Sequence, residues 1–387
     1  MAEAPSEPPP EAPRPRVWLL TSFRAGDNAQ VLGLAEALGW PFEIRQLKFR
    51  KTEFITNRLL GSTLAGVIAE GSSRLVPPWP DLVISAGRRN EPVARWIREQ
   101  AQRSAEPRQT RLVHLGRPWA DPRHFDLIVT TPQYRVPRRA NVLTIGAPLH
   151  RITADRLAEA GAKWEPKLAH LPRPWVALLV GGSSPPYVFD AAMAQELARQ
   201  ANNLARKSGA SLLITTSPRT QPEAAAALRQ AIEGPSYFQG WTPDPESNPY
   251  LGFLALADAF IVTGESMSMA AEACSTARPV HLFDMGWDWS AMRPPGHPGI
   301  VASRGIGERL APRRLQHWAL AHLLPARLRR DVRVILRRLV EEGHATWLGD
   351  PVPPSRTPPP DDMTAVVARV RALMAPPASS GAAPKSY

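Results

Sequence analysis

Short runs of apolar residues alternate along this chain with longer segments in which apolar residues recur at helical spacing. In the first half, such runs predict a buried strand at residues 17–20 and further strands at 42–47, 81–84, 111–116, 125–129 and 141–145. After the first run, Val31, Leu34, Ala35 and Leu38 recur at helical spacing and predict a helix. Strands that alternate with helices are typical of a doubly wound parallel sheet, which we predict for a domain at residues 16–150.

The second half of the chain repeats this layout. Its apolar runs predict strands at residues 175–180, 211–214, 236–238, 259–262 and 279–283. We therefore predict an α/β protein with two doubly wound, Rossmann-like domains, the second at residues 174–350. The remaining segments are predicted to be a linker at residues 151–173, a Pro-rich linker with a final helix at 351–375, and disordered tails at 1–15 and 376–387.

The net charge of the chain indicates which classes of partner it can bind. A net charge of +12, carried mostly by arginine, favours nucleotides, an anionic membrane surface or nucleic acid. The sequence has no zinc-finger spacing, no RNP-like strand and no basic region with heptads, so we expect no nucleic acid partner. The single cysteine, Cys274, excludes an internal disulfide and a cysteine metal cluster. We therefore expect a reducing cytoplasmic setting and no metal site.

Two basic segments leave contact with a membrane open. No apolar run approaches the length needed to cross a bilayer, and residues 1–16 predict neither a secretory signal nor a transit peptide. Residues 45–60 interleave basic and bulky apolar side chains, which suits either peripheral contact with the inner membrane or an amphipathic helix with a solvated basic face. Residues 308–340 are rich in arginine and suit either a surface helix or a patch that faces phosphate or membrane.

The strand ends of the second half carry small polar residues. Glycine, serine and threonine follow three predicted strands, at residues 181–184, 215–220 and 263–268. Carboxyl ends of parallel strands share one edge of a sheet, where backbone amides and helix N-termini gather, so the pattern predicts a phosphate or pyrophosphate site. Ser266 and Ser268 can cap the next helix or donate to a phosphate. Glu265 and Glu272, whose spacing puts them near one helix face, either accept hydrogen bonds from sugar hydroxyls or are ordinary solvated residues.

The first domain has polar turns in the same position. Gly26, Asp27, Asn28 and Gln30 lie in the turn after the first strand and could line a pocket, or Asp27 could simply be a helix N-cap. Arg88 and Arg89 follow the third strand, where guanidinium groups suit the capture of a phosphate or carboxylate. The spacing of these turns is not the G-x-G-x-x-G fingerprint of dinucleotide-binding proteins.

Six motifs in fixed order carry a resemblance to a known family. They are Gly26-Asp27-x-x-Gln30, Ser85-Ala86-Gly87-Arg88-Arg89, Gly181-Gly182, Thr215-Thr216-Ser217-x-Arg219-Thr220, Asn248-Pro249-Tyr250, and Ala257-Asp258 through Met269-x-x-Glu272-Ala273-Cys274. This arrangement resembles the "elongated mitochondria" family, named after a plant mitochondrial-fission factor, over residues 17–300. The chain departs from the family pattern at Pro218, Gln221, Glu265 and Ala277, where the family tends towards Arg, Pro, Asp and Gly.

The family in turn resembles glycosyltransferases of the two-Rossmann-domain type, called GT-B. The resemblance implies two domains that face each other across a cleft, with a nucleotide-sugar held by the second as co-substrate, no further cofactor and no obligatory metal. It implies acceptor contacts in the first domain and places Asp27 as general base, with His150 in reserve. The full predicted substrate-binding set is Gly26, Asn28, Gln30, Arg88, Arg89, Gly181, Gly182, Ser183, Thr216, Ser217, Arg219, Asn248, Tyr250, Glu265, Ser266, Ser268 and Glu272.

Two functions follow from this resemblance. One is a metal-independent glycosyltransferase that moves a sugar to a cell-envelope or lipid-linked acceptor at the cytoplasmic face of the inner membrane. The other is a non-catalytic scaffold of the same fold that recruits a protein partner to a membrane, as in plant mitochondrial fission. Fold likeness alone does not decide between these functions, because one fold hosts many activities.

Overall fold

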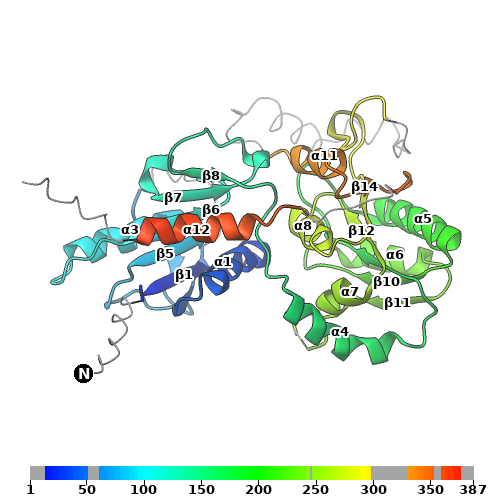
Figure 1. Cartoon of the computed structure of the whole chain (residues 1–387), viewed down its shortest axis with the longest axis horizontal. Coiled ribbons are helices and arrows are strands. Elements are labelled where there is room, and N and C mark those ends of the chain that lie inside the picture. The colour runs from blue at the N-terminus through cyan, green and yellow to red at the C-terminus, as the bar shows by residue number, and fades with distance from the viewer. Residues whose placement is uncertain (1–13, 51–60, 245, 298–329, 353–358, 376–387) are drawn as a thin grey trace, which may run out of the picture. The chain divides into compact units, whose positions relative to one another are not determined.

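The computed structural model describes residues 14–50, 61–244, 246–297, 330–352 and 359–375. Two compact units make up the chain. The N-terminal lobe comprises Met1–Val129, Arg139–Leu143 and Met363–Tyr387, and the C-terminal lobe comprises Thr130–Arg138 and Thr144–Asp362. Each lobe contains a six-stranded sheet (Figure 1).

The sheet of the N-terminal lobe has the strand order β2-β1-β5-β6-β7-β8. These strands are β2 Phe42–Gln46, β1 Val17–Thr21, β5 Leu82–Ala86, β6 Arg111–Leu115, β7 Leu127–Thr130 and β8 Val142–Thr144. Neighbouring strands from β2 to β7 pair in parallel. Strands β1, β5 and β7 are buried along their whole length, because a parallel sheet is covered on both faces.

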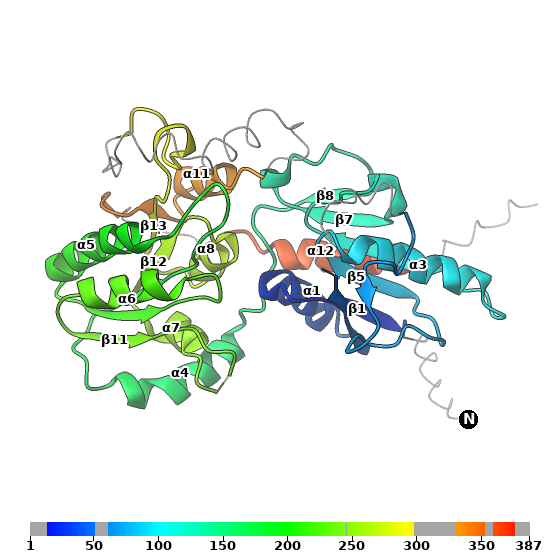
Figure 2. The same ribbon diagram turned by 180° about the vertical axis from the view of Figure 1, so that it is seen from behind.

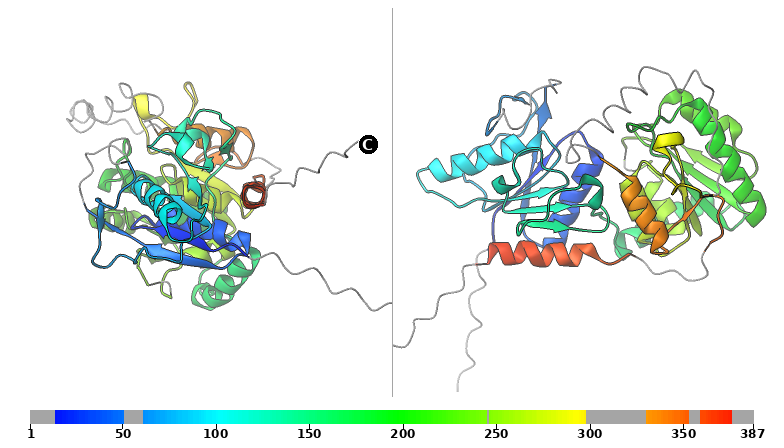
Figure 3. Two further views of the ribbon diagram at one scale, coloured as in Figure 1. Left: turned by 90° about the vertical axis from the view of Figure 1, so that its left-hand side faces the viewer. Right: turned by 90° about the horizontal axis from the view of Figure 1, so that it is seen from above.

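Helices cover the two faces of this first sheet. Helix α1 (Ala25–Leu38) packs on β1 and β5, and it ends at Gly39, whose φ of 68° is the left-handed conformation of a helix C-cap. Helices α3 (Asn90–Arg103) and α12 (Asp362–Met374) lie on opposite faces of the sheet (Figures 1 and 3). Arg371 Nη2 on α12 donates to the carbonyl of Leu38 at 3.1 Å, so the C-terminal helix is tied to the end of α1.

The sheet of the C-terminal lobe has the order β11-β10-β9-β12-β13-β14, and every neighbouring pair is parallel. Its strands are β11 Ser236–Gln239, β10 Ser211–Thr215, β9 Trp175–Leu179, β12 Ala259–Thr263, β13 Val280–Phe283 and β14 Thr346–Trp347. In chain order this is 3-2-1-4-5-6, the order of dinucleotide-binding sheets. The predicted fold class, α/β with two Rossmann-like domains, is confirmed, and each predicted strand ends within two residues of an observed one.

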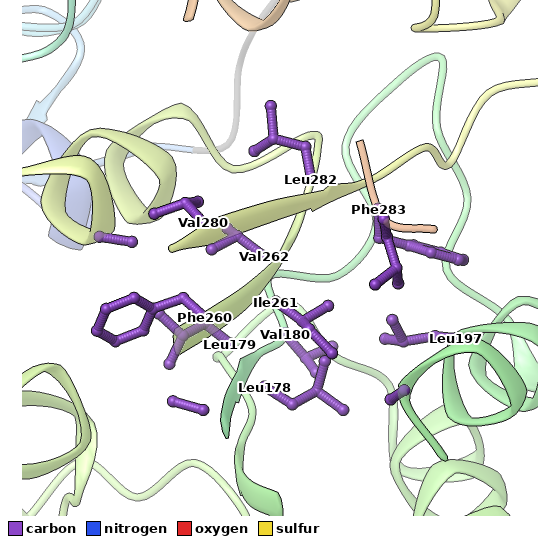
Figure 4. Packing of buried hydrophobic residues seen from close by; sticks show 14 of the residues in the cluster. Leu178, Leu179, Val180, Leu197, Phe260, Ile261, Val262, Val280, Leu282 and Phe283 are labelled. Atoms are coloured by element: carbon purple, nitrogen blue, oxygen red, sulfur yellow. The ribbon is translucent and has the colours of Figure 1, made fainter. Parts of the chain in front are cut away.

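The helices of the C-terminal lobe follow from this strand order, because right-handed crossovers change face where the order reverses. Helices α5 (Ala191–Ser208) and α6 (Pro222–Ala231) lie on one face of the sheet, and α7 (Tyr250–Leu256) and α8 (Met267–Cys274) on the other (Figures 1 and 2). Between these layers Leu178, Ile261, Val262 and Leu282 are fully buried, and Figure 4 shows Leu197 of α5 closing the same core.

The segment 151–173, predicted to be a linker, is a helix of the C-terminal lobe. Helix α4 (Ala154–Leu168) begins at Thr153, whose hydroxyl accepts from the backbone N of Arg156 at 3.3 Å. On this helix Trp164 is buried and packs edge-on against Phe253 of α7, with ring centroids 6.2 Å apart. A Cβ on Gly252 would lie 2.4 Å from Trp164 Cγ, so the Trp164 side chain packs here only because position 252 has no side chain. This packing explains why the segment folds with the lobe.

The two basic segments, residues 45–60 and 308–340, are only partly described by the structure. Residues 51–60 and 298–329 lie outside the described residues, as do the predicted tail at 376–387 and residues 1–13 of the predicted tail at 1–15. Of the described arginines, Arg333 of α11 (Arg333–Glu341) pairs with Asp331 at 2.7 Å and Arg337 donates to the carbonyl of Met292 at 2.8 Å. These two side chains therefore make contacts within the C-terminal lobe, and a patch that faces phosphate or membrane stays a prediction for this segment. None of the described helices combines the length and the apolar character needed to cross a bilayer.

Candidate functional site

Three strand ends of the C-terminal lobe meet where the strand order reverses, between β9 and β12. In sheets of this kind the crevice outside the carboxyl ends at such a reversal is where ligands bind. Gly181, which follows β9, donates its backbone N–H to Thr263 Oγ1 at the end of β12, at 2.8 Å. Its carbonyl accepts a hydrogen bond from Ser217 Oγ of the loop after β10. Direct contacts thus bring together all three of the small-residue turns that the sequence singled out.

The two glycines after β9 are required by close approaches within the protein. A Cβ on Gly181 would lie 1.9 Å from Glu265 Oε1. Gly182 has a φ of 123°, and a Cβ there would lie 2.5 Å from the backbone carbonyl of Arg219, with which it forms a parallel bridge. The expected role of the pair was close approach to a diphosphate. The structure shows that a carboxylate and a backbone of the chain itself occupy that space.

The carboxylate beside Gly181 forms a buried ion pair. Glu265 Oε1 lies 3.2 Å from Arg219 Nη2, with the Glu265 side chain 0% exposed and that of Arg219 41% exposed. Its second oxygen, Oε2, makes no hydrogen bond within the described part of the chain. Burial raises the pKa of Glu265 to about 7, against the opposing effect of the Arg219 charge. Glu265 precedes α8 instead of lying on it, so the predicted shared helix face with Glu272 is wrong.

The other predicted residues around this edge lie in the strand-end loops and in the first turn of α8, where two of them accept hydrogen bonds from backbone N–H groups. Ser183 Oγ accepts from the backbone N of Phe189 at 3.0 Å. Ser266 is the N-cap residue of α8, yet its side chain makes no capping hydrogen bond, and Ser268 lies half-buried in the first turn. Thr216 Oγ1 accepts from the backbone N of Trp241 at 2.8 Å.

Trp241 is a residue that the sequence reasoning missed. The residue is 44% exposed, and its backbone N–H is hydrogen-bonded to Thr216, in the strand-end loop that carries Ser217 and Arg219. A large aromatic ring left in solvent at the ligand edge of such a sheet offers a flat face for stacking. The signal in the sequence was a tryptophan directly after a strand and a glycine, at residues 236–241.

A second group of predicted residues lies around the start of α7. Asn248 Oδ1 accepts from the backbone N of Tyr250 at 3.0 Å, and the Tyr250 hydroxyl donates to Glu272 Oε2 on α8. Burial raises the pKa of Glu272 to about 7, and the hydrogen bond from Tyr250 opposes that shift. Burial likewise raises the pKa of the Tyr250 hydroxyl. Asn248, Tyr250 and Glu272 thus form one hydrogen-bonded chain that joins two helices.

The N-terminal lobe repeats the pattern at its own reversal of strand order, between β1 and β5. Asp27 lies in the first turn of α1, and its Oδ2 would be 2.7 Å from a Cβ on Gly87, which follows β5 and has a φ of 76°. The N-cap residue of α1 is Arg24, so the alternative interpretation of Asp27 as the N-cap is wrong. Asn28 is committed to the turn, because its Oδ1 accepts from Ser22 N at 3.0 Å and its Nδ2 donates to Ser22 O at 2.7 Å.

The remaining candidates of this lobe lie beside the same reversal. Gln30 Nε2 donates to the carbonyl of the exposed Gly26 at 3.4 Å. The guanidinium of Arg88 lies over the ring of Trp119 at 4.7 Å, and that of Arg89 over the ring of Phe23 at 5.3 Å. These two arginines therefore stack on aromatic faces from the end of β5, a contact that the sequence pattern did not predict.

His150, the reserve catalytic residue, belongs to the C-terminal lobe, whereas Asp27 belongs to the N-terminal lobe. His150 Nδ1 accepts from the backbone N of Ile152 at 3.3 Å. Burial lowers the pKa of His150, which favours the neutral imidazole, while the charge of Asp361 opposes this shift. Within the described ranges, no three His, Cys, Asp or Glu side chains gather in a way that could hold a metal ion.

Comparison with known proteins places the chain in a family. A family model described as Mitochondrial fission ELM1 matches residues 25–327. The mitochondrial fission protein ELM1 of Arabidopsis thaliana is 28% identical over 247 residues, which cover 58% of this chain and 56% of the plant protein. The uncharacterized protein RP120 of Rickettsia prowazekii (strain Madrid E) is 21% identical over 300 residues, 69% of this chain and 82% of that protein. The chain thus aligns with little more than half of the plant relative.

Solved structures show weaker likenesses. The UDP-GlcNAc 2-epimerase of Neisseria meningitidis, bound to UDP-GlcNAc, is 10% identical, with a TM-score of 0.44 over 92% of this chain and 99% of that one. The catalytic domain of starch synthase IV of Arabidopsis thaliana, bound to ADP and acarbose, is 11% identical, with a TM-score of 0.43 over 93% and 98%. Acinetobacter baumannii MurG is 12% identical, with a TM-score of 0.39 over 93% and 100%.

Proposed function

The chain belongs to the mitochondrial fission ELM1 family, and from that premise we propose that it is a glycosyltransferase with a nucleotide-sugar as donor. The donor would bind in the C-terminal lobe, where β9, β10 and β12 end. The acceptor, a hydroxyl group of a cell-envelope or lipid-linked molecule at the cytoplasmic face of the membrane, would bind at the ends of β1 and β5 in the N-terminal lobe.

One observation carries the proposal. The loops after β9, β10 and β12 converge at the reversal of a 3-2-1-4-5-6 sheet and present there one arginine, Arg219, together with the N-terminus of α8. A guanidinium group and free backbone N–H groups at a helix start are the groups that proteins use to bind a diphosphate. A parallel sheet that only supported a fold would have no need for three strand ends tied together around an arginine.

Two further groups of the same lobe suit the base and the ribose of a nucleotide. Trp241, on the neighbouring loop, offers an exposed aromatic face on which a base can stack. Glu272 offers carboxylate oxygens that can accept from ribose hydroxyls, and the hydrogen bond from Tyr250 orients it. Base, ribose and diphosphate would then be bound by three separate groups of one lobe.

The proposed reaction is a direct transfer of the sugar. A hydroxyl oxygen of the acceptor attacks the anomeric carbon of the donor sugar, and the bond from that carbon to the diphosphate oxygen breaks. Arg219 and the N-terminus of α8 stabilise the negative charge that grows on the leaving diphosphate. Asp27 takes the proton of the attacking hydroxyl, a role that suits a carboxylate in the first turn after a strand end.

A second candidate function is a scaffold that recruits a protein partner to a membrane. The name of the plant relative, a mitochondrial fission protein, favours it, and so does the carboxylate of Glu265 in the space where a diphosphate would approach Gly181. We propose contact with an anionic membrane on the basic sequence alone, because much of that sequence, at residues 51–60 and 298–329, lies outside the described residues.

The two functions are separated by a thermal-shift titration of the full chain with UDP, UDP-GlcNAc, UDP-glucose and ADP-glucose. A ligand that binds only the folded protein at about 100 times its Kd adds about 2.7 kcal/mol, which raises the Tm by several degrees. Arg219→Gln and Trp241→Ala should reduce that rise. The matched control is Arg199→Gln, which removes an arginine paired with Glu196 on α5 of the same lobe. No shift with any nucleotide favours the scaffold.

A further inference from the structure

We infer that the Glu265 carboxylate competes with the proposed diphosphate for the Arg219 guanidinium. In the free protein the carboxylate pairs with Arg219. A bound diphosphate replaces it there, and Glu265 takes up a proton. The inference rests on the proposed donor site and describes how that site is regulated. It predicts that binding of a diphosphate depends on pH in a way that one side chain controls.

The geometry of the pair supports an exchange of partners. Arg219 Nη2 contacts one oxygen of Glu265 at 3.2 Å, and the arginine side chain is 41% exposed, so a ligand can reach it from solvent. Glu265 is fully buried, and its Oε1 lies against Gly181 at a distance that excludes any side chain there. The carboxylate therefore cannot be displaced towards Gly181.

A diphosphate at Arg219 and an ionised Glu265 repel each other. Two like charges brought close together near a protein surface, where water screens them only partly, strongly disfavour each other. The second oxygen of Glu265 has no hydrogen-bond partner in the described structure, so a proton placed there breaks no existing bond and creates a donor. Proton uptake is therefore the least costly way for the site to accept the ligand.

Among the residues that the structure describes, few charged groups lie around Glu265, which makes its titration simple. The loop after β9 presents Gly181 and Gly182, which carry no charge, and the loop after β10 presents Arg219. Thr263 of β12 is neutral and hydrogen-bonds to the carboxylate through its side chain, and among the described residues Arg330 is a second cation that acts on Glu265. Burial already raises the pKa of Glu265 to about 7 in the free protein, so the exchange takes place in the physiological range.

The test is titration calorimetry of the full chain with inorganic pyrophosphate and with UDP-glucose, in buffers of different ionisation enthalpy. At pH 7 a group with a pKa of about 7 is half ionised, so wild type should take up about 0.5 proton more per ligand than Glu265→Gln. From about pH 7 to 8 the wild-type affinity should fall by up to about tenfold relative to that variant. At pH 8, Glu265→Gln should therefore bind more tightly than wild type.

Two further variants complete the design. Glu196→Gln removes a carboxylate that pairs with Arg199 on α5, and because the pKa of Glu196 is lowered it should leave both proton uptake and affinity unchanged. Arg219→Gln should weaken pyrophosphate binding by more than tenfold at pH 6, where Glu265 is protonated. This variant keeps the test informative if Glu265→Gln does not fold, because an unchanged affinity overturns the inference.

The outcomes separate the inference from the proposed function. Pyrophosphate binding with proton uptake that Glu265→Gln removes supports the inference, even if no nucleotide-sugar binds, in which case the proposed function fails alone. Nucleotide-sugar binding with equal proton uptake in wild type and Glu265→Gln overturns the inference and leaves the proposed function standing. Weaker binding by Glu265→Gln at pH 8, or no binding of either probe, also overturns it.

Discussion

Replacing Gly181 by alanine should destabilise the C-terminal lobe through one identifiable clash. The new Cβ would lie 1.9 Å from Glu265 Oε1 and 3.0 Å from Arg219 Nη2, so the carboxylate must move. Overpacking in a core costs about 1–3 kcal/mol, and disrupting a buried ion pair costs about 3–5 kcal/mol when a charge loses its partner. We expect a loss of about 3 kcal/mol, because the guanidinium of Arg219 is partly exposed and can be hydrated.

A double variant shows whether Glu265 is the cause. In Gly181→Ala/Glu265→Ala the obstructing side chain is absent, so the double variant should be hardly less stable than Glu265→Ala alone, with a coupling energy of about 3 kcal/mol. The matched control is Gly182→Ala, whose Cβ would meet the backbone of Arg219 at 2.5 Å in a residue with a φ of 123°. Truncation of Glu265 should not rescue this second variant.

Amide hydrogen exchange on the peptides of β9 and β12 is the suitable assay. It reports the free energy of opening of the C-terminal lobe separately from that of the other lobe, which matters because two lobes need not unfold together. Losses in the double variant that equal the sum of both single variants would refute the reasoning, because they would show that the methyl group added at position 181 and the Glu265 carboxylate do not meet.

Three further predictions concern stability and catalysis. Glu265 has a pKa of about 7 in the folded protein against an ordinary value of 4.5, so its contribution to the free energy of unfolding is complete below about pH 4.5 and is lost as pH rises to 7. In denaturant titrations, Glu265→Gln should therefore be more stable than wild type by up to about 3 kcal/mol at pH 8 and differ little from it at pH 4.5. Trp164→Ala should destabilise the C-terminal lobe by about 3–5 kcal/mol in hydrogen exchange on α7. Asp27→Asn should abolish sugar transfer while calorimetry shows unchanged donor binding; unchanged turnover would reject Asp27 as the base.

The strands and their ligand edges could be predicted from the sequence because their signals are local. A run such as Val17–Thr21 is apolar at nearly every position, and small polar residues directly follow strands such as β9 and β12. Parallel topology then brings these ends together at one edge of the sheet. The family resemblance added the order of the motifs.

The side chains that fill the space beside these strand ends could not be predicted, because they come from loops that are distant in the sequence. Nothing local to Gly181 shows that Glu265, from another strand end, fills the space beside it. Helix α4 was missed for the same reason: Trp164 is buried only because Gly252, far along the chain, leaves room for its ring. Ala277, where the family tends towards glycine, has a φ of 57°, a left-handed conformation that favours glycine.

A crystal structure of the full chain with its most stabilising nucleotide-sugar tests the central claim most directly. We predict diphosphate oxygens within hydrogen-bond distance of the Arg219 guanidinium and the N-terminus of α8, with Glu265 no longer paired with Arg219. A nucleotide bound elsewhere on the chain, or an ion pair between Arg219 and Glu265 that remains closed beside the ligand, would contradict the account.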